Sequence, residues 1–281
     1  MNRCGLFGLI VLISSPLLVS AAEYGYTHDY LTLNRVSIPS GHVEIVGEPL
    51  NLDIRSLALS PDGQLYGLLE VSQQGAPELS LLDTDTGQPT VIGSIEVGDL
   101  QDPTALTFHP DGRLLLLANG YPQSILYEVD PITAGLTQIL AINSYYVVSI
   151  AFFGDSCYAA SAHRLNEVDL STGEVTELPG GFGGYYTWMG PICFDDSGQL
   201  WAIEQRGHQF GCEISNLVRF DLATGEAIRI AEIPQPNGLC HYPLAIFQGP
   251  PVPVPTHGPI GTTVLILALA TLGALILAVR R

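Results

Sequence analysis

Five residues with side chains suited to ligand binding occupy corresponding places ahead of short apolar runs: Asp53, Asp102, Tyr146, Trp188 and, close to the same place, His241. Aromatic rings stack on flat apolar faces while carboxylates and imidazoles form hydrogen bonds, so this group is suited to binding a sugar or a peptide. The alternative interpretation is that these residues cap loops and pack against their neighbours without holding a ligand.

The most aromatic and glycine-rich loop of the chain is Gly180 to Gly190, which contains Tyr186 beside Trp188. Its expected position is on the same face as the loop from Arg206 to Cys212. Binding residues concentrate on loops that a rigid scaffold positions. We therefore expect a binding surface for a glycan or an envelope polymer on this face, with Tyr186 among its residues.

Other kinds of chemistry find little support. Asp83 with Asp85, and Asp195 with Asp196, resemble parts of a calcium loop, but hydrogen bonding within turns already explains aspartate at these places. The histidines lack metal-ligand spacing, and the chain has no Gly-x-Ser-x-Gly elbow, Gly-x-Gly-x-x-Gly fingerprint or P-loop. The sequence assigns no catalytic residue, no metal and no cofactor.

The elements that must position the candidate residues are short apolar runs separated by two alternating turns. The first turn reads Ser60-Pro61-Asp62-Gly63 and returns at residues 109–112, 153–156 and 195–198. The second reads Asp83-Thr84-Asp85-Thr86-Gly87 and returns at residues 130–135, 169–173 and 221–225. Four short strands joined by such turns form an antiparallel meander, which is the blade of a β-propeller.

The ends of the repeat region complete one another. Residues 31–47 match only the second half of a repeat, and residues 243–247 match only a first strand. Together they predict a composite blade that pairs the first and last strands and closes the ring. We expect an all-β propeller of five four-stranded blades over residues 23–248. The composite blade lacks a recognisable second strand, so four blades with decorations is the alternative.

The Pro-Asp-Gly and Asp-x-x-Thr-Gly hairpins resemble those of bacterial extracytoplasmic propellers of the YVTN and quinoprotein-like kind, over roughly residues 30–248. This resemblance implies the fold. It leaves the function open, because propellers of this kind include binding modules, metal-dependent lactonase-like hydrolases and quinoprotein-like dehydrogenases.

Residues 1–22 have the features of a secretory signal peptide: Arg3, an apolar core from Leu6 to Val19, and the small-residue site Val19-Ser20-Ala21. The chain has 10 basic residues, all arginine, against 28 acidic ones. So acidic a surface offers no basic patch to a nucleic acid.

Four cysteines remain after the expected processing: Cys157, Cys193, Cys212 and Cys240. An even number in an exported chain favours disulfides, and three pairings are possible. Cys157 and Cys193 are expected near one face of the propeller, and Cys212 and Cys240 near the other. We therefore predict the pairs Cys157–Cys193 and Cys212–Cys240.

The chain changes character after the repeats. Residues 249–260 are rich in proline and predict a semi-rigid spacer, and residues 261–281 contain an apolar run long enough to span a bilayer, ending in Arg280 and Arg281. The positive-inside rule places these arginines in the cytoplasm.

This tail resembles the C-terminal sorting signals of the PEP-CTERM and IPTL-CTERM classes, with Val254, Pro255 and Thr256 at the Ile-Pro-Thr position and Gly261 at the downstream glycine. Residues 257–260 depart from the usual Leu-Ser-Glu-Trp. The resemblance implies a Gram-negative host, an exosortase-like peptidase as partner, and delivery to the cell envelope or surface. The expected function is a non-catalytic binding or scaffold module, with a propeller enzyme as the alternative.

Overall fold

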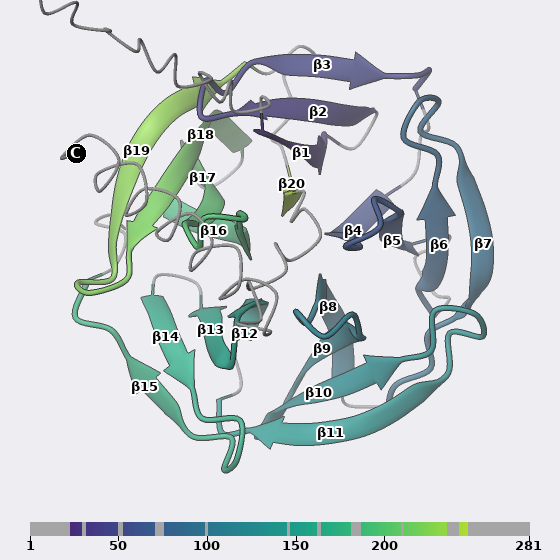
Figure 1. The fold of residues 1–281 in the computed structure, drawn as a ribbon, viewed down its shortest axis with the longest axis vertical. Helices are drawn as coiled ribbons and strands as arrows, with labels where there is room; N and C mark the ends of the chain where they lie inside the picture. Colours follow the sequence, from purple (N-terminus) through teal and green to yellow (C-terminus); the bar gives the residue numbers. More distant parts are fainter. Residues whose placement is uncertain are drawn as a thin grey trace, which may run out of the picture.

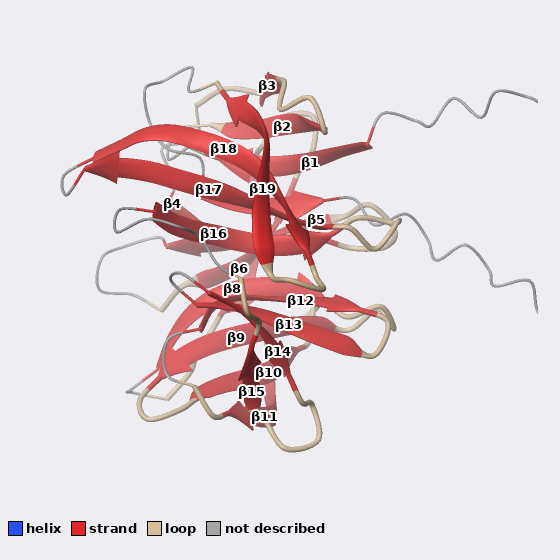
Figure 2. Ribbon diagram, turned by 90° about the vertical axis from the view of Figure 1, so that its left-hand side faces the viewer, coloured by secondary structure: helices blue, strands red, loops and turns tan. Residues whose placement is uncertain are grey.

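The computed structural model describes residues 23–29, 32–49, 53–70, 76–98, 101–144, 147–161, 164–180, 187–208, 211–234 and 242–246. These residues form five antiparallel sheets of four strands around a common centre, as Figure 1 shows. The fold is therefore an all-β propeller of five blades, as the repeat predicts. The side view in Figure 2 contains strands and loops but no helix in the described part.

Four blades follow one another along the chain, each beginning with its innermost strand. Blade 1 comprises β4 (Asp53–Leu59), β5 (Leu65–Glu70), β6 (Glu78–Leu82) and β7 (Pro89–Ser94). Blade 2 comprises β8 (Gln101–Phe108), β9 (Leu114–Gly120), β10 (Ser124–Val129) and β11 (Leu136–Ile142). Blade 3 comprises β12 (Val147–Phe153), β13 (Ser156–Ser161), β14 (Arg164–Val168) and β15 (Val175–Glu177). Blade 4 comprises β16 (Thr187–Phe194), β17 (Leu200–His208), β18 (Gly211–Asp221) and β19 (Glu226–Ile233).

The fifth blade, the closing blade, joins the two ends of the repeat region. Its order from the centre outward is β20 (Tyr242–Ile246), β1 (Glu23–His28), β2 (Leu33–Ile38) and β3 (Val43–Val46). The expectation of a missing second strand was wrong, because β1 fills that place and pairs antiparallel with both β20 and β2. The sequence of β1, Glu-Tyr-Gly-Tyr-Thr-His, contains no aliphatic side chain, which is why no apolar run announces it.

Both series of turns adopt the backbone that their glycines permit. Gly63 in the first series has φ of 86° and Gly87 in the second has φ of 74°, values that residues with a Cβ rarely adopt. In the second turn of blade 1, Asp83 Oδ1 accepts the N–H groups of Asp85 and Thr86 at 2.9 and 2.8 Å. This carboxylate caps its turn, as the sequence predicts.

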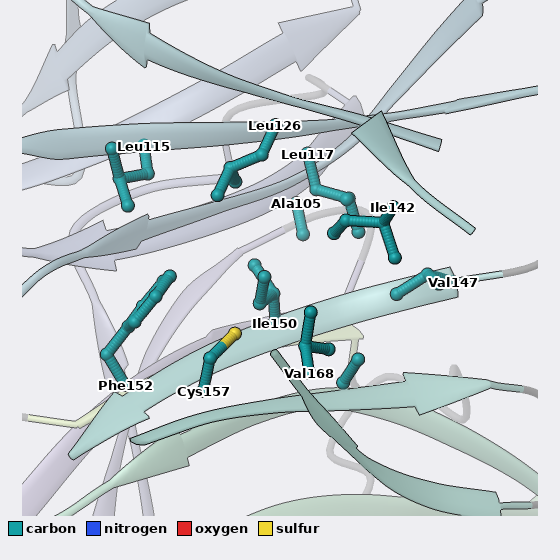
Figure 3. Packing of buried hydrophobic residues seen from close by; sticks show 11 residues of the cluster. Ala105, Leu115, Leu117, Leu126, Ile142, Val147, Ile150, Phe152, Cys157 and Val168 are labelled. Atoms are coloured by element: carbon teal, nitrogen blue, oxygen red, sulfur yellow. The ribbon is translucent and has the colours of Figure 1, made fainter. Parts of the chain in front are cut away.

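The hydrophobic core is divided into five clusters, one in each gap between neighbouring blades. Because a blade is covered on both sides, its middle strands are apolar at successive residues. In β9, Leu114 and Leu116 face blade 1, whereas Leu115 and Leu117 face blade 3. Figure 3 shows the cluster between blades 2 and 3, where Phe152 and Cys157 pack with these two leucines.

The blades also meet around the circumference, where the end of an outer strand reaches the second turn of the next blade. Gly47, just after β3, lies against the Thr86 carbonyl oxygen of blade 1, and Gly173 of blade 3 lies against the Ala141 carbonyl oxygen of β11. The Gly180 N–H donates to the Thr224 carbonyl at 2.5 Å. Glycine is required at these joints because a Cβ would collide with the neighbouring backbone.

The predicted disulfide Cys157–Cys193 is not formed. Cys157 is buried between blades 2 and 3, whereas Cys193 packs against the cluster between blade 4 and the closing blade. The two thiols are therefore separated by more than one blade, although both lie beside the first turn of their blade, at the same end of the propeller. The predicted partner of Cys212, Cys240, lies outside the described residues.

The signal peptide (residues 1–22), the spacer and the tail also lie outside the described residues, and with them the sorting residues Val254, Pro255, Thr256, Gly261, Arg280 and Arg281. Within the part of the chain that the structure describes, no helix is long and apolar enough to cross a membrane.

Candidate binding site at the channel mouth

The centre of the propeller is nearly filled by side chains. The second halves of all five inner strands, β4, β8, β12, β16 and β20, line one central cavity of about 30 Å³. Their shared direction places the beginnings of the inner strands together at one end, which we call the mouth, and their ends together at the other, which we call the far face. A cavity of this size holds a water molecule or two, so this half of the channel has no room for a larger ligand.

Each inner strand has an irregularity in its register near the mouth. The pairing shifts between Ile54 and Ser56 in β4, between Pro103 and Ala105 in β8, and at matching places in β12, β16 and β20. A bulge re-aims the side chain of its extra residue. In β4 and β8 these bulge residues are Arg55 and Thr104.

The register explains why the candidate binding residues align. Asp53 stands two residues before the bulge residue Arg55, and Asp102 stands two residues before Thr104. The backbone of Trp188 lies in β16 opposite Gln205, two residues before Gly190, where β16 has its irregularity. These three positions are equivalent, as the sequence predicts.

A pocket of about 270 Å³ opens at the mouth between blades 1 and 2. Its lining comes from the start of β4, the end of β5 and the start of β8: Asp53, Ile54, Arg55, Glu70, Asp102, Pro103 and Thr104. The structure thus brings Asp53 and Asp102 to one pocket. Tyr146, Tyr186 and His241 lie outside the described residues.

Arg55 is the centre of this pocket and joins the two blades. Its Nε donates to Glu70 Oε2 at 3.0 Å within blade 1, and its Nη2 lies 2.9 Å from the same oxygen. Its Nη1 reaches Asp102 Oδ1 of blade 2 at 2.5 Å. The guanidinium is therefore held between two carboxylates, which fixes its plane across the mouth of the gap.

Sequence reasoning missed Arg55 and Glu70. Arg55 follows Asp53 at the bulge, and Glu70 lies directly opposite Asp53 in the hairpin formed by β4 and β5. Counting outward in both directions from the turn at Ser60–Gly63 would have paired Glu70 with Ile54, next to the observed partner Asp53. The bulge offsets that count by one residue.

The pocket is acidic in balance, because three carboxylates face one guanidinium. Desolvation raises the pKa of Asp53, the nearby Glu70 carboxylate raises it further, and Arg55 acts in the opposite direction. Burial acts to lower the pKa of Arg55, but the hydrogen bonds to Glu70 and Asp102 outweigh it and raise that pKa. Asp53 forms no ion pair with a described residue and keeps its carboxylate available to a ligand.

A second arginine–carboxylate cluster, the blade 4 cluster, lies within one blade. Arg229 of β19 donates from Nη2 to Glu204 Oε1 at 2.7 Å and from Nε to Oε2 at 2.5 Å. Asn216 Nδ2 of β18 donates to the same Oε2 at 3.1 Å. These contacts hold three adjacent strands of blade 4 together.

Two of the aspartates that resemble calcium ligands, Asp83 and Asp195, accept hydrogen bonds within or beside their turns. Asp195 accepts the Ser197 and Gln199 N–H groups through Oδ1, both at 2.9 Å, and the Trp201 Nε1–H through Oδ2 at 2.7 Å. No group of three or more potential metal ligands occurs among the described residues.

No protein family model and no curated sequence matches the chain. Among solved structures, the fold is similar to a chain of the nidogen/laminin complex, with 11% identity, a TM-score of 0.56, and coverage of 80% of this chain and 98% of that one. Regucalcin from Agrobacterium tumefaciens, described as a calcium-binding protein, matches with 22% identity, a TM-score of 0.45 and coverage of 82% and 79%. TolB from Acinetobacter baumannii matches with 17% identity, a TM-score of 0.48 and coverage of 82% and 62%. At these identities the likeness concerns the fold alone.

Proposed function

We propose that the protein is an exported, membrane-anchored or exosortase-sorted propeller that acts as a non-catalytic binding or scaffold module for a polymer of the cell envelope or extracellular space. The observation that carries this proposal is the pocket between blades 1 and 2, where Arg55 holds Glu70 and Asp102 in place above a nearly filled channel. An ordered polar pocket on a rigid ring is suited to recognition.

The pocket chemistry narrows the class of polymer. Asp53 and Asp102 offer acceptors for hydroxyl or ammonium groups, and the guanidinium of Arg55 contributes donors. Because the carboxylates outnumber the guanidinium, an anionic polymer would be repelled. A neutral or amino-bearing saccharide therefore fits this pocket best.

The export and anchoring parts of the proposal are supported by sequence features. The signal peptide, the proline-rich spacer and the apolar tail ending in Arg280 and Arg281 follow the order of an exported domain held at a bilayer. The resemblance of the tail to PEP-CTERM and IPTL-CTERM signals supports processing by an exosortase-like peptidase in a Gram-negative envelope.

A thermal-shift titration of the full chain in detergent tests the binding function. Neutral, amino-bearing and carboxylated oligosaccharides are compared, with the wild type beside Asp102→Asn and the control Glu177→Gln. Glu177 forms a comparable ion pair with Arg164 in the two outer strands of blade 3, 2.7 Å long and outside the pocket between blades 1 and 2. A ligand of the folded state raises the melting temperature by mass action.

We expect a neutral or amino-bearing oligosaccharide to raise the melting temperature of the wild type and of Glu177→Gln, but not of Asp102→Asn. A shift that persists in Asp102→Asn, or no shift with any saccharide, would contradict the proposal. If EDTA lowers the melting temperature and a divalent metal restores it, the metal-dependent enzyme becomes the better interpretation.

A further inference from the structure

The closing blade fixes the face from which both ends of the described propeller emerge. Strand β20 begins at the mouth, like the other inner strands, and its last residue, Ile246, lines the opposite half of the channel. Strand β1 runs antiparallel to it, with Gly25 opposite Ile246 and His28 opposite Tyr242. Glu23 at the start of β1 and Ile246 at the end of β20 therefore both lie at the far face.

The pocket lies at the other end of the same strands. Asp53 is the first residue of β4 and Asp102 the second of β8, and the cavity they border is lined by residues from these strand beginnings and by Glu70 at the end of β5. The candidate binding site and the two points where the chain leaves the ring are thus on opposite faces of the propeller.

If the tail anchors the chain in a membrane, this arrangement determines which face of the propeller lies nearer to the bilayer. The spacer of residues 249–260 follows β20 almost directly and, as a proline-rich extended chain of 12 residues, spans at most about 37 Å. The proline content of residues 249–260 predicts a semi-rigid spacer, which would keep the face to which it is joined nearer to the bilayer. The direction of β20, from the mouth to the far face, then determines which end of the channel faces away from the membrane.

We propose that the anchored propeller stands with its mouth pocket turned away from the membrane and its far face turned toward it. The inference rests on the proposed membrane anchoring, and it adds that the pocket is presented to polymers arriving from outside rather than to lipid head groups.

The orientation is measurable by energy transfer from a dye on the propeller to acceptor lipids in vesicles that carry the full chain. The dye is attached at p-azidophenylalanine placed at either end of β9, by Pro110→p-azidophenylalanine or by Tyr121→p-azidophenylalanine. Pro110 is exposed in the turn before β9 at the far face, and Tyr121 is 77% exposed just after β9 at the mouth. The 7 residues of β9 separate the two sites by about 23 Å.

We expect more efficient transfer from position 110 than from position 121, with the order unchanged when the dye is attached to a Glu177→Gln background. Equal transfer from the two positions, or the reverse order, would overturn the orientation while leaving the anchoring and the pocket intact. Failure of the labelled chain to float with the vesicles would overturn the anchoring itself and the orientation with it.

Discussion

The two arginine–carboxylate clusters contain the same chemical groups but differ in where the groups lie and how exposed they are. In the mouth pocket, Arg55 connects Glu70 of one blade to Asp102 of another, and the Asp102 side chain is 65% exposed. In the blade 4 cluster, Arg229 binds Glu204 within one sheet, and the Glu204 side chain is only 1% exposed. Both Glu204 oxygens are already bonded to protein donors.

This difference separates a structural ion pair from a site for a ligand. A carboxylate that is buried and bonded to protein donors at both oxygens is closed to a ligand, and removal of its arginine partner leaves an unpaired buried charge. A carboxylate that is exposed at the edge of a pocket contributes little to stability and retains free acceptor positions. The position of the pair relative to the blade gap, rather than its chemistry, makes the distinction.

The largest effect is expected from Arg229→Met. This substitution leaves the Glu204 carboxylate buried without its guanidinium partner, and breaking such a pair costs about 3 kcal/mol of unfolding free energy. Chemical denaturation of the wild type and the variant measures the loss. The double variant Glu204→Gln with Arg229→Met should recover part of it, and a loss below about 1 kcal/mol would place this pair with the exposed ones.

Arg55→Met should instead have a small effect on stability and a large effect on ligand binding. The unfolding free energy falls by about 1 kcal/mol or less, because both partners remain partly solvated. Ligand binding, however, should weaken by at least about tenfold, since one charge-assisted hydrogen bond contributes roughly 1.5 kcal/mol or more. Calorimetric titration with the saccharide identified by thermal shift measures this. Retained affinity together with a large loss of stability would show that Arg55 is structural.

The sequence was informative where residue type and spacing alone decide the outcome. The alternating turns set the number of blades, and the fixed distance from each first turn located Asp53 and Asp102. Strand β1 was not recognised because Tyr26 is its buried hydrophobic side chain and no aliphatic run marks it in the sequence. Strand β1 lies between β20 and β2 and pairs with both. These two strands come from opposite ends of the repeat region, so only the tertiary structure reveals the place that β1 fills.

The wrong disulfide Cys157–Cys193 and the missed Arg55 show that some predictions need the register of the strands as well as the spacing of residues in the sequence. The prediction for Cys157 and Cys193 considered the end of the strand but not the side of the blade. Side chains alternate between the two sides of a blade. In β13, Cys157 and Ala159 face blade 2. In β16, Ile192 and Phe194 face blade 3, so Cys193 between them faces the closing blade. Arg55 was missed for a related reason, because a bulge directs its side chain across the gap.

The smallest expected effect concerns pH and the remaining pocket carboxylate. Because desolvation and the Glu70 charge raise the folded-state pKa of Asp53 above its unfolded value, its ionisation opposes folding. The stabilising contribution of the protonated form is complete below the unfolded pKa of about 3.9 and is lost as the pH rises through the raised folded-state value. Asp53→Asn removes this titration.

The melting temperature of the wild type should therefore decrease relative to that of Asp53→Asn as the pH rises from about 4 to neutrality. The turn aspartate Asp83 provides a contrasting control, since the backbone N–H groups of Thr86 and Asp85 lower its pKa. Its contribution is present above the unfolded pKa and is lost on acidification, so Asp83→Asn should change the curve with the opposite sign. If the two variants shift the curve in the same direction, the pocket carboxylate is not desolvated, and the distinction between Asp53 and a solvated turn residue fails.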